Sequence, residues 1–242
     1  GRFAYVAAGD RGLEIIDVLD PTAPARVGGL ATNGSASRVV LRGDMAYVAV
    51  WGSGLEVIDV QDPTAAVRVG TATASLFNTF IDVAVSDDGL YAYVAADQAG
   101  LQIFDVGIAN QPTWVGRVET GGAARGVTLS GDGRYAYVAA GDAGLEIIDV
   151  QNADDAVRIG RVDTPGSAAA VVVTADGRYA YVADDQAGLQ IIDVSSPSAP
   201  ALLGQMVTGG SARDVALSAD GQYVFLADWT GGLQIIDVQD PA

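Results

Sequence analysis

The heptapeptide Gly-Leu-Glu-Ile-Ile-Asp-Val at residues 12–18 decides the fold, because near-copies of it recur along the whole chain. The leading glycines of successive copies are 42, 46, 44, 44 and 44 residues apart. The copies are GLEIIDV (12–18), GLEVIDV (54–60), GLQIFDV (100–106), GLEIIDV (144–150), GLQIIDV (188–194) and GLQIIDV (232–238). The chain of 242 residues is therefore built from repeats of roughly 44 residues.

Further blocks accompany the heptapeptide, and all of them are typical of short strands. A Tyr-Val block such as AYVAA (136–140) precedes it, and an Arg-Ile-Gly block (158–160) follows it. A block such as ARGVTLS (124–130) then leads through an Asp-Gly turn into the next Tyr-Val block. Turn residues bound every block and interrupt any helical period. Four antiparallel strands per repeat of this length predict a β-propeller blade.

These motifs resemble the LVIVD repeat family, and the resemblance covers nearly the whole chain. It implies an all-β propeller of about six four-stranded blades. It also implies that GVTLS (126–130) is the innermost strand, followed outward by YAYVA (135–139), LEIIDV (145–150) and RIGRV (158–162). Because members of the family are mostly surface or secreted proteins, the resemblance further implies an extracellular or cell-surface location.

The repeat is incomplete at both ends of the sequence. Gly1–Val6 aligns with Gly133–Val138, so the sequence begins inside the first turn of a blade, without an innermost strand. Asp240–Ala242 stands just before an outermost strand. We therefore expect a single propeller domain over residues 1–242 with incomplete first and last blades, as part of a longer polypeptide or assembly.

The strand count also allows a second closure. An outer strand near Ala25–Thr32 could complete the last blade, which gives five full blades and leaves residues 1–18 as a surplus hairpin. Under either scheme, unpaired strand edges remain at the ends. We expect these edges to bind a protein partner or to mediate self-association.

Composition excludes several classes of function. The 30 acidic and 13 basic residues give a formal net charge of −17, and every basic residue is arginine. Such a surface repels phosphate backbones, so no nucleic acid is expected as a partner. No apolar run approaches the roughly 18 residues of a membrane span. His, Cys and Lys are absent, which removes the commonest general base, thiol nucleophiles and Schiff bases. We expect a protein that is not an enzyme.

Most carboxylates repeat with the motif. One Asp per repeat precedes a turn, where its side chain can accept hydrogen bonds from turn amides. These structural turn aspartates are Asp17, Asp59, Asp105, Asp149, Asp193 and Asp237. A second position carries Glu in three repeats and Gln in the others: Glu14, Glu56, Glu146, Gln102, Gln190 and Gln234. This exchange predicts a solvated strand face, not the paired carboxylates of a glycosidase.

Positions that differ between repeats are where a binding site can be added to a periodic scaffold. They lie where the innermost strands begin and in the loops between second and third strands, which the family geometry places around the central channel. The candidate binding residues are Arg38, Asp82, Arg125, Arg213 and Asp214 at strand entries, Trp51 and Trp229 in equivalent loops, and Phe77 in the inserted loop. Exposed aromatic side chains are typical of interface anchors, or they can cover the rim of the core.

Two interpretations of this face stay open. It forms either a mixed-charge funnel satisfied by ion pairs and water, or a ligand site. Its acidic loops offer oxygen ligands for Ca²⁺, although no DxDxDG-type loop is present. No other cofactor is expected. The first hypothesis is a non-enzymatic interaction or structural module outside the cell, and the alternative is a ligand- or carbohydrate-binding propeller, with Ca²⁺ assisting.

Overall fold

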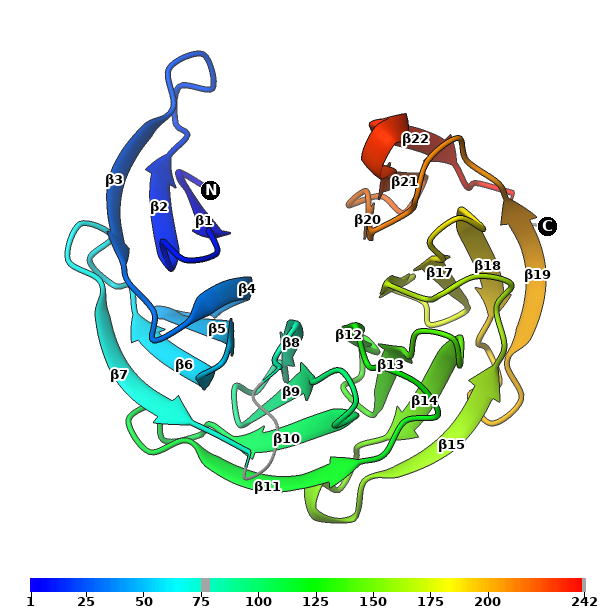
Figure 1. The fold of residues 1–242 in the computed structure, drawn as a ribbon, viewed down its shortest axis with the longest axis horizontal. Coiled ribbons are helices and arrows are strands. Elements are labelled where there is room, and N and C mark those ends of the chain that lie inside the picture. The colour runs from blue at the N-terminus through cyan, green and yellow to red at the C-terminus, as the bar shows by residue number, and fades with distance from the viewer. Residues whose placement is uncertain (75–78, 241–242) are drawn as a thin grey trace. The chain divides into compact units, whose positions relative to one another are not determined.

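The computed structural model describes residues 1–74 and 79–240, and its regular structure is almost entirely β. Six small antiparallel sheets follow one another along the chain, each built from consecutive strands (Figure 1). Two single-turn 3₁₀ helices, η1 (Ala153–Asp155) and η2 (Trp229–Gly231), also occur. The predicted six-bladed β-propeller is confirmed.

The chain divides into two compact units, Gly1–Ala96 with Gln102–Gly116 and Asp97–Leu101 with Arg117–Ala242. The first unit holds the first two sheets and most of the third. The strands of the first three sheets are β1 (Phe3–Ala7), β2 (Leu13–Asp17), β3 (Ala25–Leu30), β4 (Ser35–Arg42), β5 (Met45–Trp51), β6 (Gly54–Asp59), β7 (Val67–Ala72), β8 (Asp82–Val85), β9 (Tyr91–Ala95), β10 (Leu101–Asp105) and β11 (Thr113–Val118). Those of the last three are β12 (Gly126–Leu129), β13 (Tyr135–Ala139), β14 (Leu145–Asp149), β15 (Val157–Val162), β16 (Ala170–Val173), β17 (Tyr179–Ala183), β18 (Leu189–Asp193), β19 (Ala201–Met206), β20 (Asp214–Leu217), β21 (Tyr223–Ala227) and β22 (Leu233–Asp237).

The first and last sheets have three strands each, and the four between them have four. The expectation of incomplete first and last blades is therefore confirmed. The five-blade alternative is wrong, because β3 pairs with β2 from Leu13↔Leu30 to Asp17↔Ala25. A short turn joins these two strands, so their pairing is local and closes with little loss of chain entropy.

Apolar side chains alternate along the strands and pack between neighbouring blades. In the second unit, Leu145 and Ile147 of β14 are fully buried and share a cluster with Val171, Val182 and Ile192 of the next blade. Neighbouring blades therefore cover each other's apolar faces, which is the stabilisation that a repeat cannot supply alone.

In the fourth blade, a glycine at a bulge lets the blade approach the turn of its neighbour. The ladder between β14 and β15 shifts register between Ile147 and Ile148, opposite Gly160. A Cβ at Gly160 would lie 2.0 Å from the carbonyl oxygen of Pro197 in the next turn. The glycine is therefore required for close packing against the following Pro turn.

Candidate functional site

The six turn aspartates share one geometry and lie on six different blades. Each carboxylate oxygen Oδ1 accepts the N–H of the residue two positions later, at 2.9 to 3.1 Å. This is the hydrogen bond of an Asx turn. A hydrogen bond from Arg2, followed by one from the Leu19 amide, lowers the pKa of Asp17. Each of these aspartates therefore holds the turn of its own blade.

The repeating Glu/Gln position is buried in the second to fifth blades and half-buried at Glu14 and Gln234, so the expectation of a solvated strand face is wrong. Glu56 and Glu146 have no exposed surface, and Gln102 keeps only 2%. Glu146 Oε1 accepts from Arg158 Nη1 at 2.7 Å and from the Gly121 amide at 2.9 Å. The outer strand and the linker from the preceding blade cover the side chain, which no single repeat reveals.

The sequence did contain a signal for this buried pair. Each Glu has an Arg twelve positions later on the outer strand, and the pairs Glu14–Arg26, Glu56–Arg68 and Glu146–Arg158 are ion pairs. Where Gln replaces Glu, the partner changes as well, and the Trp114 indole N–H donates to Gln102 Oε1 at 2.9 Å. The two positions vary together, which indicates a structural role within the blade.

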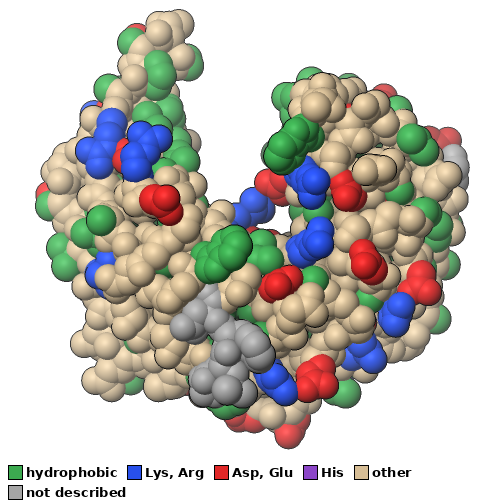
Figure 2. All heavy atoms as spheres, viewed as in Figure 1, with side chains coloured by type: hydrophobic (Ala, Val, Ile, Leu, Met, Phe, Trp, Pro, Cys, Tyr) green, Lys and Arg blue, Asp and Glu red, His purple; other side chains and the backbone are tan. Residues whose placement is uncertain are grey.

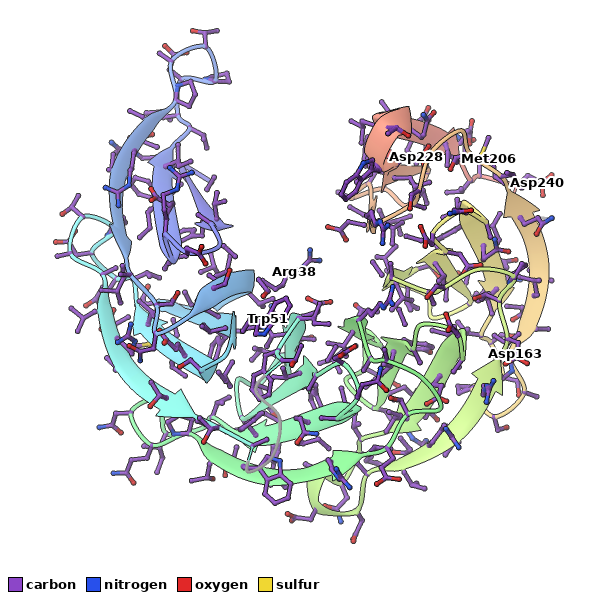
Figure 3. All side chains as sticks on the ribbon, viewed as in Figure 1. Arg38, Trp51, Asp163, Met206, Asp228 and Asp240 are labelled. Atoms are coloured by element: carbon purple, nitrogen blue, oxygen red, sulfur yellow. The ribbon has the colours of Figure 1, made fainter. Side chains whose placement is uncertain are left out.

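In the fifth and sixth blades, a buried acid lies instead at the end of the second strand. Asp184 and Asp228 have no exposed surface. Thr164 Oγ1 donates to Asp184 Oδ1 at 2.6 Å, and Thr208 Oγ1 donates to Asp228 Oδ1 at 2.7 Å. Burial raises the pKa of Asp184. These aspartates hold the linkers between blades, and Figure 3 labels Asp228 at the loop between β21 and β22.

The loop between second and third strands also joins blade to blade. Backbone bridges connect it to the next innermost strand at Gly9↔Ala36, Asp97↔Ala124, Gly141↔Ala168 and Asp185↔Ala212. The loop residue of each bridge has a positive φ. It is glycine in two of the bridges, whereas Asp97 and Asp185 adopt φ values of 50° and 49°. Trp229, at the equivalent position of the sixth blade, has φ 39°. A bulky side chain in this region is strained, by about 1–3 kcal/mol.

In the first unit, the structure brings two predicted residues together. Arg38 Nε of β4 lies 3.0 Å from Asp82 Oδ1 at the start of β8. Trp51, the last residue of β5, is 61% exposed. Figure 3 shows Arg38 and Trp51 on the second sheet. Phe77 lies outside the described residues.

In the second unit, Trp229 and Arg213 form the centre of a surface cluster. The Arg213 guanidinium carbon lies 5.4 Å from the centroid of the Trp229 ring. Arg213 Nη2 lies 3.5 Å from Asp185 Oδ1, and the Ser211 hydroxyl also donates to this carboxylate. Trp229 is 71% exposed. We call Asp185, Ser211, Arg213 and Trp229 the Trp229 rim.

The remaining predicted residues of this unit lie at strand entries. Asp214 Oδ1 accepts the N–H of Val215 at 2.9 Å, and the Arg125 amide donates to the Ala139 carbonyl at 2.8 Å. Over the second unit, Figure 2 shows basic and acidic side chains next to one another. Within residues 1–74 and 79–240, no group of three or more His, Cys, Asp or Glu side chains could hold a metal ion. The described helices include none long and apolar enough to cross a membrane.

Comparison with known proteins identifies the repeat and the fold. A family model described as LVIVD repeat matches residues 1–32, 33–73, 81–120, 121–164, 165–208 and 209–242. No curated protein sequence matches the chain.

Three solved structures illustrate the range of proteins with this fold. Hydrazine synthase of Kuenenia stuttgartiensis is 18% identical, with a TM-score of 0.75 over 98% of this chain and 80% of that chain. A chain of the mitotic checkpoint complex is 17% identical, with a TM-score of 0.82 over 99% of this chain and 75% of that chain. The β-propeller domain of Myceliophteria thermophila Cps50 (Swd1) is 13% identical, with a TM-score of 0.77 over 99% of this chain and 81% of that chain. At these identities the similarity shows the fold alone.

Proposed function

We propose that this chain, which belongs to the LVIVD repeat family, is a non-enzymatic protein-interaction module that binds its partner through the Trp229 rim. The observation that carries the proposal is an indole 71% exposed on a backbone of φ 39°. The unfavourable backbone opposes folding, and a ring that stays exposed contributes little burial to offset that cost, so the sequence gains little stability from a Trp at this position. Contact with a partner supplies a reason to keep them.

The composition and order of the rim suit a protein interface. Trp and Arg are the residues most enriched among those that dominate binding energy at interfaces. Arg213 lies over the Trp229 ring and close to Asp185, so both side chains are held in place before binding. Such preorganisation lowers the entropy cost of association. The partner should present an apolar or aromatic side chain to the indole and an acceptor oxygen to Arg213.

The experiment compares two tryptophan variants. Trp229→Ala removes the exposed ring of the rim, and Trp114→Ala removes a ring that is 44% exposed on β11. Proteins from the organism that encodes the chain are captured on each immobilised form, and any protein retained by wild type is purified and titrated. We expect Trp229→Ala to weaken binding of the purified partner by about 2 kcal/mol or more, and Trp114→Ala to leave it unchanged. Equal affinity of wild type and Trp229→Ala would contradict the proposal.

Self-association through a strand edge belongs to the same proposal. In the last sheet, β22 is an edge strand, and its Leu233 and Ile235 are 66% and 62% exposed. Leu145 and Leu189, at the position of Leu233 in two other repeats, are fully buried. We propose a second copy as the occupant, paired edge to edge, because identical alternating apolar residues on the two strands are self-complementary.

Sedimentation of the purified chain tests this pairing. Ile235→Lys should shift the population toward the monomer, whereas Leu202→Lys on β19, where Leu202 is 41% exposed, should not. A wild-type chain that stays monomeric at high concentration would refute the edge pairing and leave the Trp229 rim to be tested separately.

A carbohydrate ligand is the second candidate function. It is favoured by the exposed indole of Trp229 in a cluster with polar groups, since sugars combine stacking with polar contacts. Arg213 lies over the indole and close to Asp185, which accepts from the Ser211 hydroxyl. A Ca²⁺ ion that assists sugar binding would need oxygen ligands from the sugar in addition to the oxygens of Ser211 and Asp185. A glycan panel screened with and without Ca²⁺ would support this candidate if a bound glycan is lost with Trp229→Ala.

The extracellular or cell-surface location is likewise a proposal, supported by the resemblance to the family.

A further inference from the structure

The first sheet has a free strand edge where every other sheet carries an innermost strand. Its order is β1-β2-β3, so β1 is the last strand on one side (Figure 1). In the other five sheets, the strand equivalent to β1 pairs on both sides. An edge strand presents a row of backbone N–H and C=O groups, which is a template for a further strand.

The hydrogen bonds at both ends of β1 show which backbone groups face this edge. The Val18 amide donates to the Arg2 carbonyl at 2.9 Å, and the Ala8 amide donates to the Gly12 carbonyl at 2.8 Å. Arg2 and Ala8 therefore face β2, and the direction of bonding alternates along an antiparallel strand. The residues whose backbone groups face the free edge are Phe3, Tyr5 and Ala7.

The complete blades show what bonds these groups. In the fourth blade, the carbonyl oxygens at the positions of Phe3 and Ala7 accept the amides of Ser130 and Arg125, at 2.9 and 2.8 Å. Ser130 and Arg125 flank the innermost strand β12. The same two bonds occur in the third, fifth and sixth blades, all at 2.8 to 2.9 Å. Within residues 1–74 and 79–240, no strand supplies these donors to β1.

The side chains of β1 are also less covered than those of its equivalents. Val6 is 39% exposed, whereas the valines at its position in the next four blades have no exposed surface. Tyr5 is half-buried, and its counterparts in those blades are at most 4% exposed. A strand added to β1 would place a side chain directly opposite Val6, within contact distance.

The edge is unprotected and held in place. Phe3–Ala7 contains neither a charge nor a Pro, which are the usual means of protecting an exposed edge. On the side of the second sheet, Tyr5 packs against a buried cluster that includes Leu13, Ile15 and Val48. The strand is therefore ordered before binding, which lowers the entropy cost of association.

The innermost strands of four other sheets indicate which side chains fit this edge. They read DVAV (82–85), GVTL (126–129), AVVV (170–173) and DVAL (214–217). The first residue is Asp, Gly or Ala, the second is always Val, and the fourth is Val or Leu. The Val is at most 8% exposed in all four strands. In the register of β12 with β13, it lies opposite the position of Val6.

We propose that the β1 edge binds an extended segment of a partner protein as a fourth, antiparallel strand. The segment has a Val, preceded by Asp, Gly or Ala and followed two residues later by Val or Leu. The Val lies opposite Val6, and amides of the segment donate to the carbonyl oxygens of Phe3, Tyr5 and Ala7. The inference rests on the proposed function in that the chain binds proteins, and it assigns a surface other than the Trp229 rim.

The probe is a capped synthetic peptide with the sequence of residues 123–131, AARGVTLSG, titrated into the isotope-labelled chain. We expect saturable amide NMR shifts along Phe3–Ala7. N-methylation at the position of Thr128, which pairs with the equivalent of Tyr5, should weaken binding by about tenfold. N-methylation at the position of Val127 is the matched control, because that N–H points away from β1, and it should leave the affinity unchanged.

Ala7→Pro tests the same edge from the side of the chain. A Pro is tolerated where an edge strand has its N–H toward solvent, so the fold should be kept, but the added strand loses a donor and should bind about tenfold more weakly. Ala7→Ser keeps the N–H and should bind as wild type does. Trp229→Ala and Ile235→Lys test the surfaces of the proposed function and should leave the peptide affinity unchanged, so the two proposals can fail separately.

Three outcomes would overturn the inference. The first is no saturable binding of the peptide at up to about 1 mM. The second is equal affinity of the two N-methylated peptides, which needs no variant of the chain. The third is a set of shifts confined to β22, or an Ala7→Pro chain that binds the peptide as tightly as wild type.

Discussion

Arg158→Leu should destabilise the second unit unless Glu146 is changed to Gln at the same time. Arg158 Nη1 lies 2.7 Å from Glu146 Oε1, and the glutamate is fully buried while the arginine is 41% exposed. The fifth blade carries Gln190 and Leu202 at the same two positions. The double variant Glu146→Gln/Arg158→Leu therefore copies a pair that this fold already accommodates.

The structure allows each cost to be worked out. Arg158→Leu leaves a buried carboxylate whose Oε1 keeps only the Gly121 amide and whose Oε2 has no partner among the described residues. Breaking a fully buried pair costs about 3–5 kcal/mol, and because Arg158 is partly exposed and water reaches the pair, we expect about 2 kcal/mol. Glu146→Gln keeps the acceptor for Gly121, so it should cost about 1 kcal/mol.

The double variant should then cost about 1 kcal/mol, since neither charge remains and the Gln can bond as its counterpart does. In the fifth blade, Gln190 Nε2 donates to the Ala187 carbonyl at 3.0 Å. The coupling energy between the two positions is therefore about 2 kcal/mol. Urea unfolding of the four proteins measures it, with equal m-values required for comparison. Single-variant costs that add to within about 0.5 kcal/mol would refute the reasoning.

Three further predictions concern packing and pH. Leu145 is fully buried, so Leu145→Ala should lower the free energy of unfolding by about 3 kcal/mol in the same urea assay. Leu233 stands at the same repeat position but is 66% exposed, so Leu233→Ala should cost under about 1 kcal/mol. Gly160→Ala places a Cβ 2.0 Å from the Pro197 carbonyl oxygen and should lower the free energy of unfolding by about 2 kcal/mol or more. Gly204→Ala should be nearly neutral, because the nearest atom to its Cβ is 3.9 Å away. A similar fall in melting temperature for both variants would contradict the close-packing argument. Burial raises the pKa of Asp184 above the ordinary 3.8, so the folded state binds the carboxyl proton more tightly than the unfolded state does. The stability of wild type relative to Asp184→Asn should therefore fall as the pH rises from 3.8 through the raised pKa. Thermal melts of both proteins across that window measure this change, and a relative gain in stability with rising pH would contradict it.

Burial could not be predicted for the Glu/Gln positions from one repeat. Glu56 and Gln102 belong to residue types that favour water, and alternation along the strand placed them on a polar face. The outer-strand Arg68 and the amide of Asn33 in the linker cover Glu56 together, and both lie far from it in sequence. The spacing of twelve residues between Glu56 and Arg68 can be read from the sequence. That the two side chains form a buried ion pair depends on which strands lie side by side.

The predicted site was recovered only in pieces. Arg38 and Asp82 form an ion pair in the first unit, and Arg213 stacks with Trp229 in the second. Asp185 belongs to the acidic loops predicted for this face, but its pairing with Arg213 was not predicted, because it depends on the backbone bridge between Asp185 and Ala212.

The choice between five and six blades stayed open until the pairing of β3 with β2 decided it. The spacing of GLEIIDV and its companion blocks was enough to predict four-stranded repeats and the incomplete blades at either end. These features depend on local turns and on a period of alternation, which each repeat carries within its own residues. Tertiary structure decided which polar groups lose their water and which aromatic rings stay exposed. Those outcomes depend on the face that a neighbouring blade presents, and residues distant in sequence supply its two sides, as Gly121 and Glu146 do.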